Sequence, residues 1–169
     1  IRDSDKIGAE FEKGTLFLPQ LIMSAGVAQA AFEVIRKHMV MSDNAPVSKG
    51  KIVIATVKGD VHDIGKNIVK VLLENYGYDV IDLGKDVEYQ AVVDAIRDND
   101  VKLCGLSALM TTTLVSMKET IALIRENNLD CKVMVGGAVL TPEYAKEIDA
   151  DFYAKDAKES VDIAKRVLG

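Results

Sequence analysis

Cysteine is scarce in this chain, which holds only two among its 169 residues. Cys104 and Cys131 lie far apart, so they offer neither a disulfide framework nor a closely spaced thiolate metal site. A reducing, cytoplasmic setting suits this composition better than an oxidising one. No apolar run approaches the roughly 20 residues of a membrane-spanning helix, and residues 1–14 lack the basic and apolar regions of a secretory signal. We therefore expect no membrane partner.

Positive charge is not in excess either. The formal net charge is −5, which speaks against a surface that tracks nucleic-acid phosphates. The chain also lacks a Gly-x-Gly-x-x-Gly motif and a P-loop, so a nucleotide-binding α/β domain is disfavoured. A receiver domain needs an acidic cluster for magnesium. Asp60 and Asp63 provide only a weak version of such a cluster, and the histidine between them would have no role in it.

The sequence divides into two parts of different pattern. Apolar residues make up 49% of it, enough for one compact domain and a smaller appendage. Residues 1–41 have apolar side chains at roughly helical spacing and predict two helices of a partial bundle. Residues 42–50 are polar, carry Pro46 and Gly50, and predict a linker. The chain begins like the interior of a helix, so we expect further residues before Ile1.

From residue 51 to residue 169, short apolar runs alternate with amphipathic stretches. Strands are expected at 51–57, 78–84, 101–107, 131–137 and 151–154. Helices are expected at 64–77, 87–99, 111–127, 141–149 and 156–169. Apolar strands separated by helices predict a parallel sheet covered on both faces. Five such strands suit the flavodoxin-like (Rossmann-like) order 2-1-3-4-5, and the fold class is therefore α/β.

In that topology three unusual loops meet at the carboxyl edge of the sheet, where such folds bind their ligands. The first carries the run Gly59-Asp60-Val61-His62-Asp63-Ile64-Gly65, and the others carry residues 107–109 and 136–138. Asp60 is close enough to His62 to orient its ring, as metal-bound imidazoles commonly require. A lone loop histidine is usually only a surface side chain, but the adjacent carboxylate and the position at the ligand edge favour a metal ligand.

The segment 59–65 resembles the Asp-x-His-x-x-Gly motif of cobalamin-binding domains in methionine synthases and corrinoid methyltransferase proteins. The resemblance covers essentially the whole chain and is most specific over residues 49–69. It implies that His62 is the lower axial ligand of cobalt and that cobalamin, as methylcobalamin or cob(I)alamin, binds base-off and His-on. The residues of this loop that would contact the cofactor are Gly59, Asp60, Val61, His62, Asp63 and Gly65.

The resemblance also implies a pocket for the nucleotide tail of the cofactor. Its residues would be Ser107, Leu109, Gly136 and Gly137, with Tyr153 and Ala157 in a further loop. Glycine leaves room for a flat heterocycle against the backbone. Considered alone, the glycine pair would indicate a tight strand-to-loop turn, and Ser107 would equally suit a helix cap.

Thr113 corresponds in the family to the third member of an Asp-His-Ser relay with Asp60 and His62. Threonine in place of serine is a mild departure that keeps the hydroxyl group. The run of threonines at 111–113 also suits simple capping of the next helix, with Thr111 as both the cap and a cofactor contact.

The segment 11–25 is similar to the helical cap of methionine synthase, in which residues matching Phe11 and Leu18 shield the methyl group. By periodicity alone both would be ordinary core residues. The resemblance implies a methyl carrier that works with methyl-donor and methyl-acceptor domains or subunits, such as those for tetrahydrofolate or homocysteine, and with a reductive activation partner. Alternatives are the cobalamin domain of an adenosylcobalamin-dependent mutase and a cobalamin-binding regulatory sensor. Whether the chain is a shuttle or part of a larger enzyme stays open.

Overall fold

The computed structural model describes residues 48–169, which belong to the compact unit Val47–Gly169. The predicted helical cap at 1–41, with Phe11 and Leu18, lies outside the described residues, as does most of the predicted linker at 42–50. Both stay predictions.

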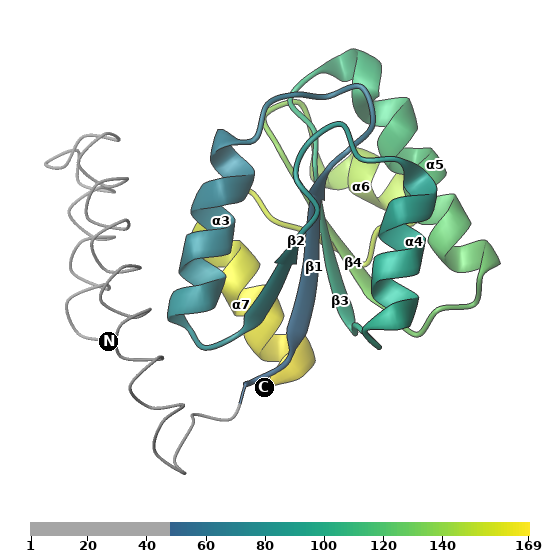
Figure 1. The fold of residues 1–169 in the computed structure, drawn as a ribbon. Coiled ribbons are helices and arrows are strands. Elements are labelled where there is room, and N and C mark those ends of the chain that lie inside the picture. Colours follow the sequence, from purple (N-terminus) through teal and green to yellow (C-terminus); the bar gives the residue numbers. More distant parts are fainter. Residues whose placement is uncertain (1–47) are drawn as a thin grey trace, which may run out of the picture. The chain divides into compact units, whose positions relative to one another are not determined.

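The described residues form a five-stranded parallel sheet with helices on both faces (Figure 1). The strand order is β2-β1-β3-β4-β5, as predicted. The strands are β1 (Lys51–Thr56), β2 (Asp79–Asp82), β3 (Leu103–Ser107), β4 (Lys132–Gly136) and β5 (Phe152–Tyr153). The helices are α3 (Ile64–Asn75), α4 (Tyr89–Asp98), α5 (Leu114–Glu126), α6 (Pro142–Glu147) and α7 (Ala157–Leu168).

Strand periodicity divides the core between the two faces of the sheet. Along β1, Ile52 and Ile54 pack with side chains of α3 and α7, whereas Val53 and Ala55 pack with side chains of α4, α5 and α6. Successive side chains of a strand point to opposite faces, so a fully buried strand must be apolar on both. This requirement explains the unbroken apolar runs seen in the sequence.

Helix boundaries follow local capping chemistry where the sequence supplies it. Thr141 accepts the Tyr144 N–H at 3.2 Å and begins α6, while Asp156 accepts the Glu159 N–H at 2.8 Å and begins α7. The stretch predicted as one helix from residue 111 instead opens with a 3₁₀ turn, η1 (Thr111–Thr113). Neither η1 nor α5 has a side-chain cap, so the predicted capping role of Thr111 is wrong.

Candidate functional site

The register of the sheet aligns the carboxyl ends of its three central strands. Thr56 of β1 pairs with Ser107 of β3, which pairs in turn with Gly136 of β4. The loops that follow these three residues are those that the sequence singled out. They leave the sheet side by side, so residues of distant sequence segments meet at one edge (Figure 1).

The centre of this edge is the carboxylate of Asp60, which is fully buried. Its Oδ1 accepts the His62 N–H at 3.0 Å and faces the His62 Nδ1 at 2.8 Å. Its Oδ2 accepts from the Leu109 N–H at 2.7 Å, the Met110 N–H at 3.2 Å and the Thr113 hydroxyl at 2.9 Å. Five donors therefore surround one carboxylate, two on the first oxygen and three on the second.

Two opposing effects act on the pKa of Asp60. Burial raises the pKa because it disfavours the charged form, but the hydrogen bonds from His62, Leu109 and Thr113 lower it and together prevail. The net result is a pKa well below the ordinary value of 3.8. Asp60 is therefore an anion at neutral pH.

His62 presents its ring nitrogen Nδ1 to this anion. A carboxylate only accepts hydrogen bonds, so in the neutral ring Nδ1 carries the proton and Nε2 carries the lone pair. The side chain is 46% exposed, and within residues 48–169 no hydrogen bond reaches Nε2. The Thr56 hydroxyl also donates to the His62 carbonyl at 3.3 Å, which holds the loop over the end of β1. The arrangement offers an oriented imidazole lone pair for a metal ion.

Thr113 lies beneath this pair and is almost fully buried. Its single hydroxyl proton has two acceptors at 2.9 Å, Asp60 Oδ2 and Met110 O. The structure thus brings together the three residues that the family resemblance grouped, Asp60, His62 and Thr113. Thr111 lies on the exposed side of the same turn.

Four exposed apolar side chains, here called the apolar rim, lie at the same edge of the sheet as His62. Among the described residues, the exposed large apolar side chains are Val61 (55%), Ile64 (65%), Leu109 (41%) and Val115 (58%). All four come from the loops and first helical turns at the same edge as His62. Exposed apolar side chains that gather in one place usually mark a binding surface. The apolar rim therefore offers apolar surface for a ligand at this edge.

The glycines of the site differ in what a side chain would meet. A Cβ on Gly65, in the first turn of α3, would have nothing within 4 Å. A Cβ on Gly136 would lie 3.1 Å from Ala154 O, and one on Gly137 would overlap the carbonyl oxygen of Ala108. Gly137 also has a φ of 139°. Local packing alone therefore requires glycine at 137, as the tight-turn interpretation expects, and the tail pocket stays a prediction.

We expect Gly137→Ala to lower the free energy of unfolding by about 3 kcal/mol, because the methyl group must displace the backbone at Ala108. Gly84→Ala is the matched control, since Gly84 also has a positive φ (89°) but has nothing within 4 Å of a Cβ. It should cost only about 1 kcal/mol. Urea unfolding of both variants measures the difference, and equal losses would contradict the packing argument.

The remaining predicted contacts occupy varied positions at this edge. Asp63 precedes α3 and makes no side-chain cap, while Ser107 ends β3. The Tyr153 hydroxyl donates to Leu140 O at 3.3 Å, and Ala157 is the first residue of α7. Their contacts with a cofactor stay predictions.

Sequence reasoning missed several residues that shape the site. Val115 and Ile64 carried a weak signal, as apolar residues in helical first turns beside the predicted loops. The buried Lys66 contacts Asp82 Oδ1 at 2.5 Å and Asn67 Oδ1 at 2.9 Å, which joins α3 to β2. The sequence gives no sign that Lys66 is buried, because lysine is usually exposed and its neighbour Asn67 is polar.

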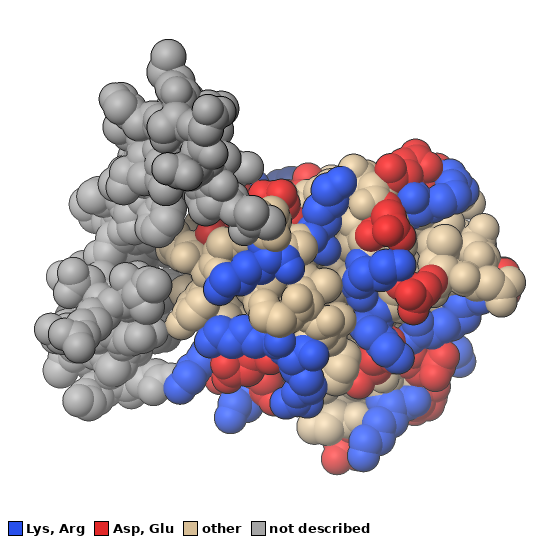
Figure 2. Space-filling model, turned by 90° about the horizontal axis from the view of Figure 1, so that it is seen from below, with Lys and Arg blue, Asp and Glu red and all other residues tan. Residues whose placement is uncertain are grey.

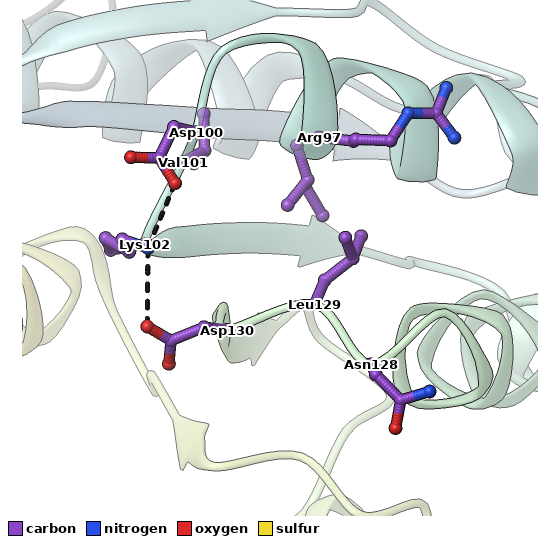
Figure 3. Close-up of a pocket in the computed structure, with 8 residues that line it drawn as sticks. Arg97, Asp100, Val101, Lys102, Asn128, Leu129 and Asp130 are labelled. Carbon is purple, nitrogen blue, oxygen red and sulfur yellow. Dashed lines mark hydrogen bonds and ion pairs between the residues drawn. The ribbon is translucent and has the colours of Figure 1, made fainter.

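A pocket of about 220 Å³ lies at the opposite, amino edge of the sheet (Figure 3). Its lining residues are Ile96, Arg97, Asp100, Val101, Lys102, Asn128, Leu129 and Asp130. Lys102 is paired with Asp100 at 3.0 Å and with Asp130 at 3.3 Å, and Arg97 points away. The face seen from this side carries interspersed charges of both signs (Figure 2). The pocket therefore has no part in the site around His62.

Comparison with known proteins decides the family. The B12 binding domain family matches residues 50–162, and a second B12 binding domain family matches residues 5–36. The chain belongs to the B12 binding domain family. It is 42% identical over 166 residues to dimethylamine corrinoid protein 1 of Methanosarcina acetivorans, which covers 97% of this chain and 78% of that protein.

Two solved structures extend the comparison. A cobalamin-binding protein of Desulfitobacterium hafniense has a TM-score of 0.80 at 34% identity, over 98% of this chain and 78% of that one. The methanol:cobalamin methyltransferase complex MtaBC of Methanosarcina barkeri has a TM-score of 0.85 at 32% identity, over 98% of this chain and 63% of that one. These matches confirm the predicted cobalamin-binding domain with flavodoxin-like fold, and its kinship with corrinoid proteins of methyltransferase systems.

Among residues 48–169 no helix is long and apolar enough to span a membrane.

Proposed function

We propose that this B12-binding protein is a methyl carrier that holds cobalamin at the carboxyl edge of its sheet, base-off, with His62 as the lower axial ligand. One observation carries the proposal: buried Asp60 holds the partly exposed His62 ring through Nδ1, which leaves Nε2 for a metal at the edge that also carries the apolar rim. An imidazole oriented in this way through a second hydrogen bond is typical of metal ligands.

The residues present fit such a cofactor on three counts. His62 is the only histidine among residues 48–169, and its ring is held by the Asp60 carboxylate. A single protein ligand suffices for a cobalt that the corrin ring already holds. The rim of Val61, Ile64, Leu109 and Val115 provides apolar surface beneath a macrocycle. Gly65 leaves open space next to the imidazole loop. Bound cobalamin would supply a cobalt centre that accepts and releases a methyl group.

The protein's own residues govern the proton on the imidazole. In cobalamin-loaded protein Nε2 would hold the cobalt while Nδ1–H donates to Asp60, which would stabilise positive charge on the ring. With His62 off the metal, the anion of Asp60 would still hold the ring through Nδ1 and would stabilise positive charge on it. Thr113 can redirect its hydroxyl from Asp60 Oδ2 to Met110 O, since both lie at 2.9 Å. These three residues would hold the imidazole in the orientation that ligation needs.

We further propose that the partners are methyltransferase subunits for a methylated amine or alcohol. The support is kinship with a dimethylamine corrinoid protein and with a methanol:cobalamin methyltransferase complex. A reductive activation partner and a cap at 1–41, shielding the methyl group through Phe11 and Leu18, complete the proposal. A mutase domain or a regulatory sensor has no comparable support in these matches.

The decisive experiment is reconstitution with cobalamin followed by electron paramagnetic resonance of the reduced, cobalt(II) form. Protein grown with histidine labelled with the heavy nitrogen isotope should show an altered nitrogen splitting relative to unlabelled protein. Such a change would show that the splitting of the cobalt signal comes from a histidine nitrogen and not from a nitrogen of the nucleotide tail. An identical spectrum from both samples, or a protein that is colourless after desalting, would overturn the proposal.

Gly65→Ala tests whether the glycine serves the cofactor or the fold. The apo protein should gain about 0.5 kcal/mol in free energy of unfolding, because alanine is the better helix former and has free space. Cobalamin affinity should fall about ten-fold, because the methyl group intrudes on the cofactor. Equilibrium dialysis and urea unfolding measure both effects. Glu119→Ala, at an exposed position of α5, is the control and should leave affinity unchanged. Undiminished affinity in Gly65→Ala would remove this glycine from the site.

A further inference from the structure

The segment that follows β2, residues 83–88, lies beside the end of β1 and the His62 loop. The Leu83 N–H donates to Ile54 O at 2.9 Å, the Thr56 N–H to Gly84 O at 2.9 Å, and the Val87 N–H to Thr56 O at 3.1 Å. The segment thus continues the parallel pairing beyond β2. It ends next to the turn at Gly59 and Asp60 that follows β1.

Asp86 makes two hydrogen bonds to this turn. Its side-chain Oδ1 accepts the Gly59 N–H at 2.7 Å, and its own N–H donates to Asp60 O at 2.9 Å. These bonds hold the backbone on both sides of the Gly59–Asp60 peptide. The other end of the same turn is held by the Asp60 N–H, which donates to Val57 O at 3.0 Å.

The backbone of Asp86 is in the left-handed region, with a φ of 54°. Three other non-glycine residues between 48 and 169 share this conformation: Asp100, Asn128 and Asp149. Each of those lies two residues after the end of a helix, where a left-handed residue is common. Asp86 lies in a strand-to-helix connection instead. Helix termination therefore does not account for its conformation, which accompanies two hydrogen bonds to the turn at Gly59 and Asp60.

We propose that Asp86 is a positioning residue for the Asp60–His62 pair. It fixes the Gly59–Asp60 backbone so that the Asp60 carboxylate faces Nδ1 of His62, and it thereby sets how readily Nε2 ligates cobalt. The consequence for cobalt rests on the proposed function, but the consequence for the ring of His62 does not. Aspartate suits this position because its short side chain carries an acceptor for the Gly59 N–H and its backbone tolerates a positive φ.

Three substitutions separate the side-chain acceptor from the backbone conformation. Asp86→Asn keeps both the acceptor and the tolerance of a positive φ. Asp86→Gly keeps the conformation and the N–H to Asp60 O but loses the acceptor for Gly59. Asp100→Gly is the matched control, because it replaces another left-handed aspartate at the opposite edge of the sheet.

The first readout is nitrogen NMR of the cofactor-free chain, with the His62 signals identified by their loss in His62→Ala. Wild type, Asp86→Asn and Asp100→Gly should all show His62 with its proton on Nδ1. Asp86→Gly should show a mixture of the two tautomers. Thermal unfolding of Asp86→Gly checks that the fold persists, which we expect because glycine removes the strain of a positive φ.

The second readout is the absorption spectrum after reconstitution with methylcobalamin at neutral pH. The ratio of His-on to His-off protein should fall about five-fold in Asp86→Gly, the loss expected for one hydrogen bond, and stay unchanged in Asp86→Asn. Wild-type behaviour of Asp86→Gly in both readouts, or an equal loss in Asp86→Asn, overturns the proposal for Asp86. An unchanged spectrum in His62→Ala instead overturns the proposed function, and the tautomer measurement then decides on Asp86 alone.

Discussion

Replacement of His62 by alanine is expected to convert bound methylcobalamin from the His-on spectrum to the base-off spectrum at neutral pH. The reason is that the described part of the chain offers no second imidazole at the carboxyl edge of the sheet, so the lower position of cobalt would lose its nitrogen ligand. The protein should still fold and bind the corrinoid through its other contacts. Absorption spectroscopy after reconstitution and desalting measures the result.

Two controls make this result specific. Free imidazole added to His62→Ala should restore the spectrum of nitrogen-ligated cobalt, because the substitution removes only the nitrogen ligand. The free energy of unfolding should change by less than about 1 kcal/mol, since the His62 side chain is 46% exposed. An unchanged absorption spectrum in the variant would reject His62 as the ligand.

Asp60→Asn is expected to have the largest effect on stability. Asparagine has the shape of aspartate, but its amide group donates instead of accepting. The NH₂ group of asparagine must replace either Oδ1 or Oδ2. At Oδ1 it would face two of the five donors that surround Asp60, and at Oδ2 it would face three. Buried donors left without an acceptor cost about 1–3 kcal/mol each, so we expect a loss of about 3 kcal/mol or more at neutral pH. Denaturant unfolding measures it.

Asp63→Asn is the matched control for this prediction. Asp63 lies in the same loop, carries the same charge and makes no side-chain cap to α3. Its replacement should change the free energy of unfolding by less than about 0.5 kcal/mol. Equal losses in the two variants would show that loop charge, and not the five hydrogen bonds, accounts for the effect.

The advantage of wild type over Asp60→Asn should depend on pH in a defined direction. The pKa of Asp60 is lowered in the folded protein from an ordinary value of 3.8, by hydrogen bonds that outweigh burial. The carboxylate therefore contributes its full stability above pH 3.8 and loses it as the pH falls below 3.8 toward the folded pKa. The two unfolding curves should converge in acid. A gap that widens as the pH falls would contradict the ionised state of Asp60.

Much of the fold followed from periodicity. The apolar runs and the amphipathic stretches between them identified every described strand and α-helix, but not the 3₁₀ turn η1, and the predicted flavodoxin-like strand order is the observed one. The error at Thr111 arose because a run of threonines resembles a helix cap in sequence. In the structure Thr113 instead donates to the Asp60 carboxylate 53 residues away, a contact that the family resemblance indicated but local spacing does not reveal.

The sequence by itself determined the domain type, the edge of the sheet that carries the site, and the Asp60–His62 pair, because these depend on residues adjacent in the chain or on a regular repeat. Only the tertiary structure decided what holds that pair in place. Leu109 and Met110 act through backbone N–H groups, which are identical in every residue but proline and leave no mark in sequence. Asp86 reaches Gly59 across 27 residues, and its role depends on a backbone angle that only the packed sheet imposes.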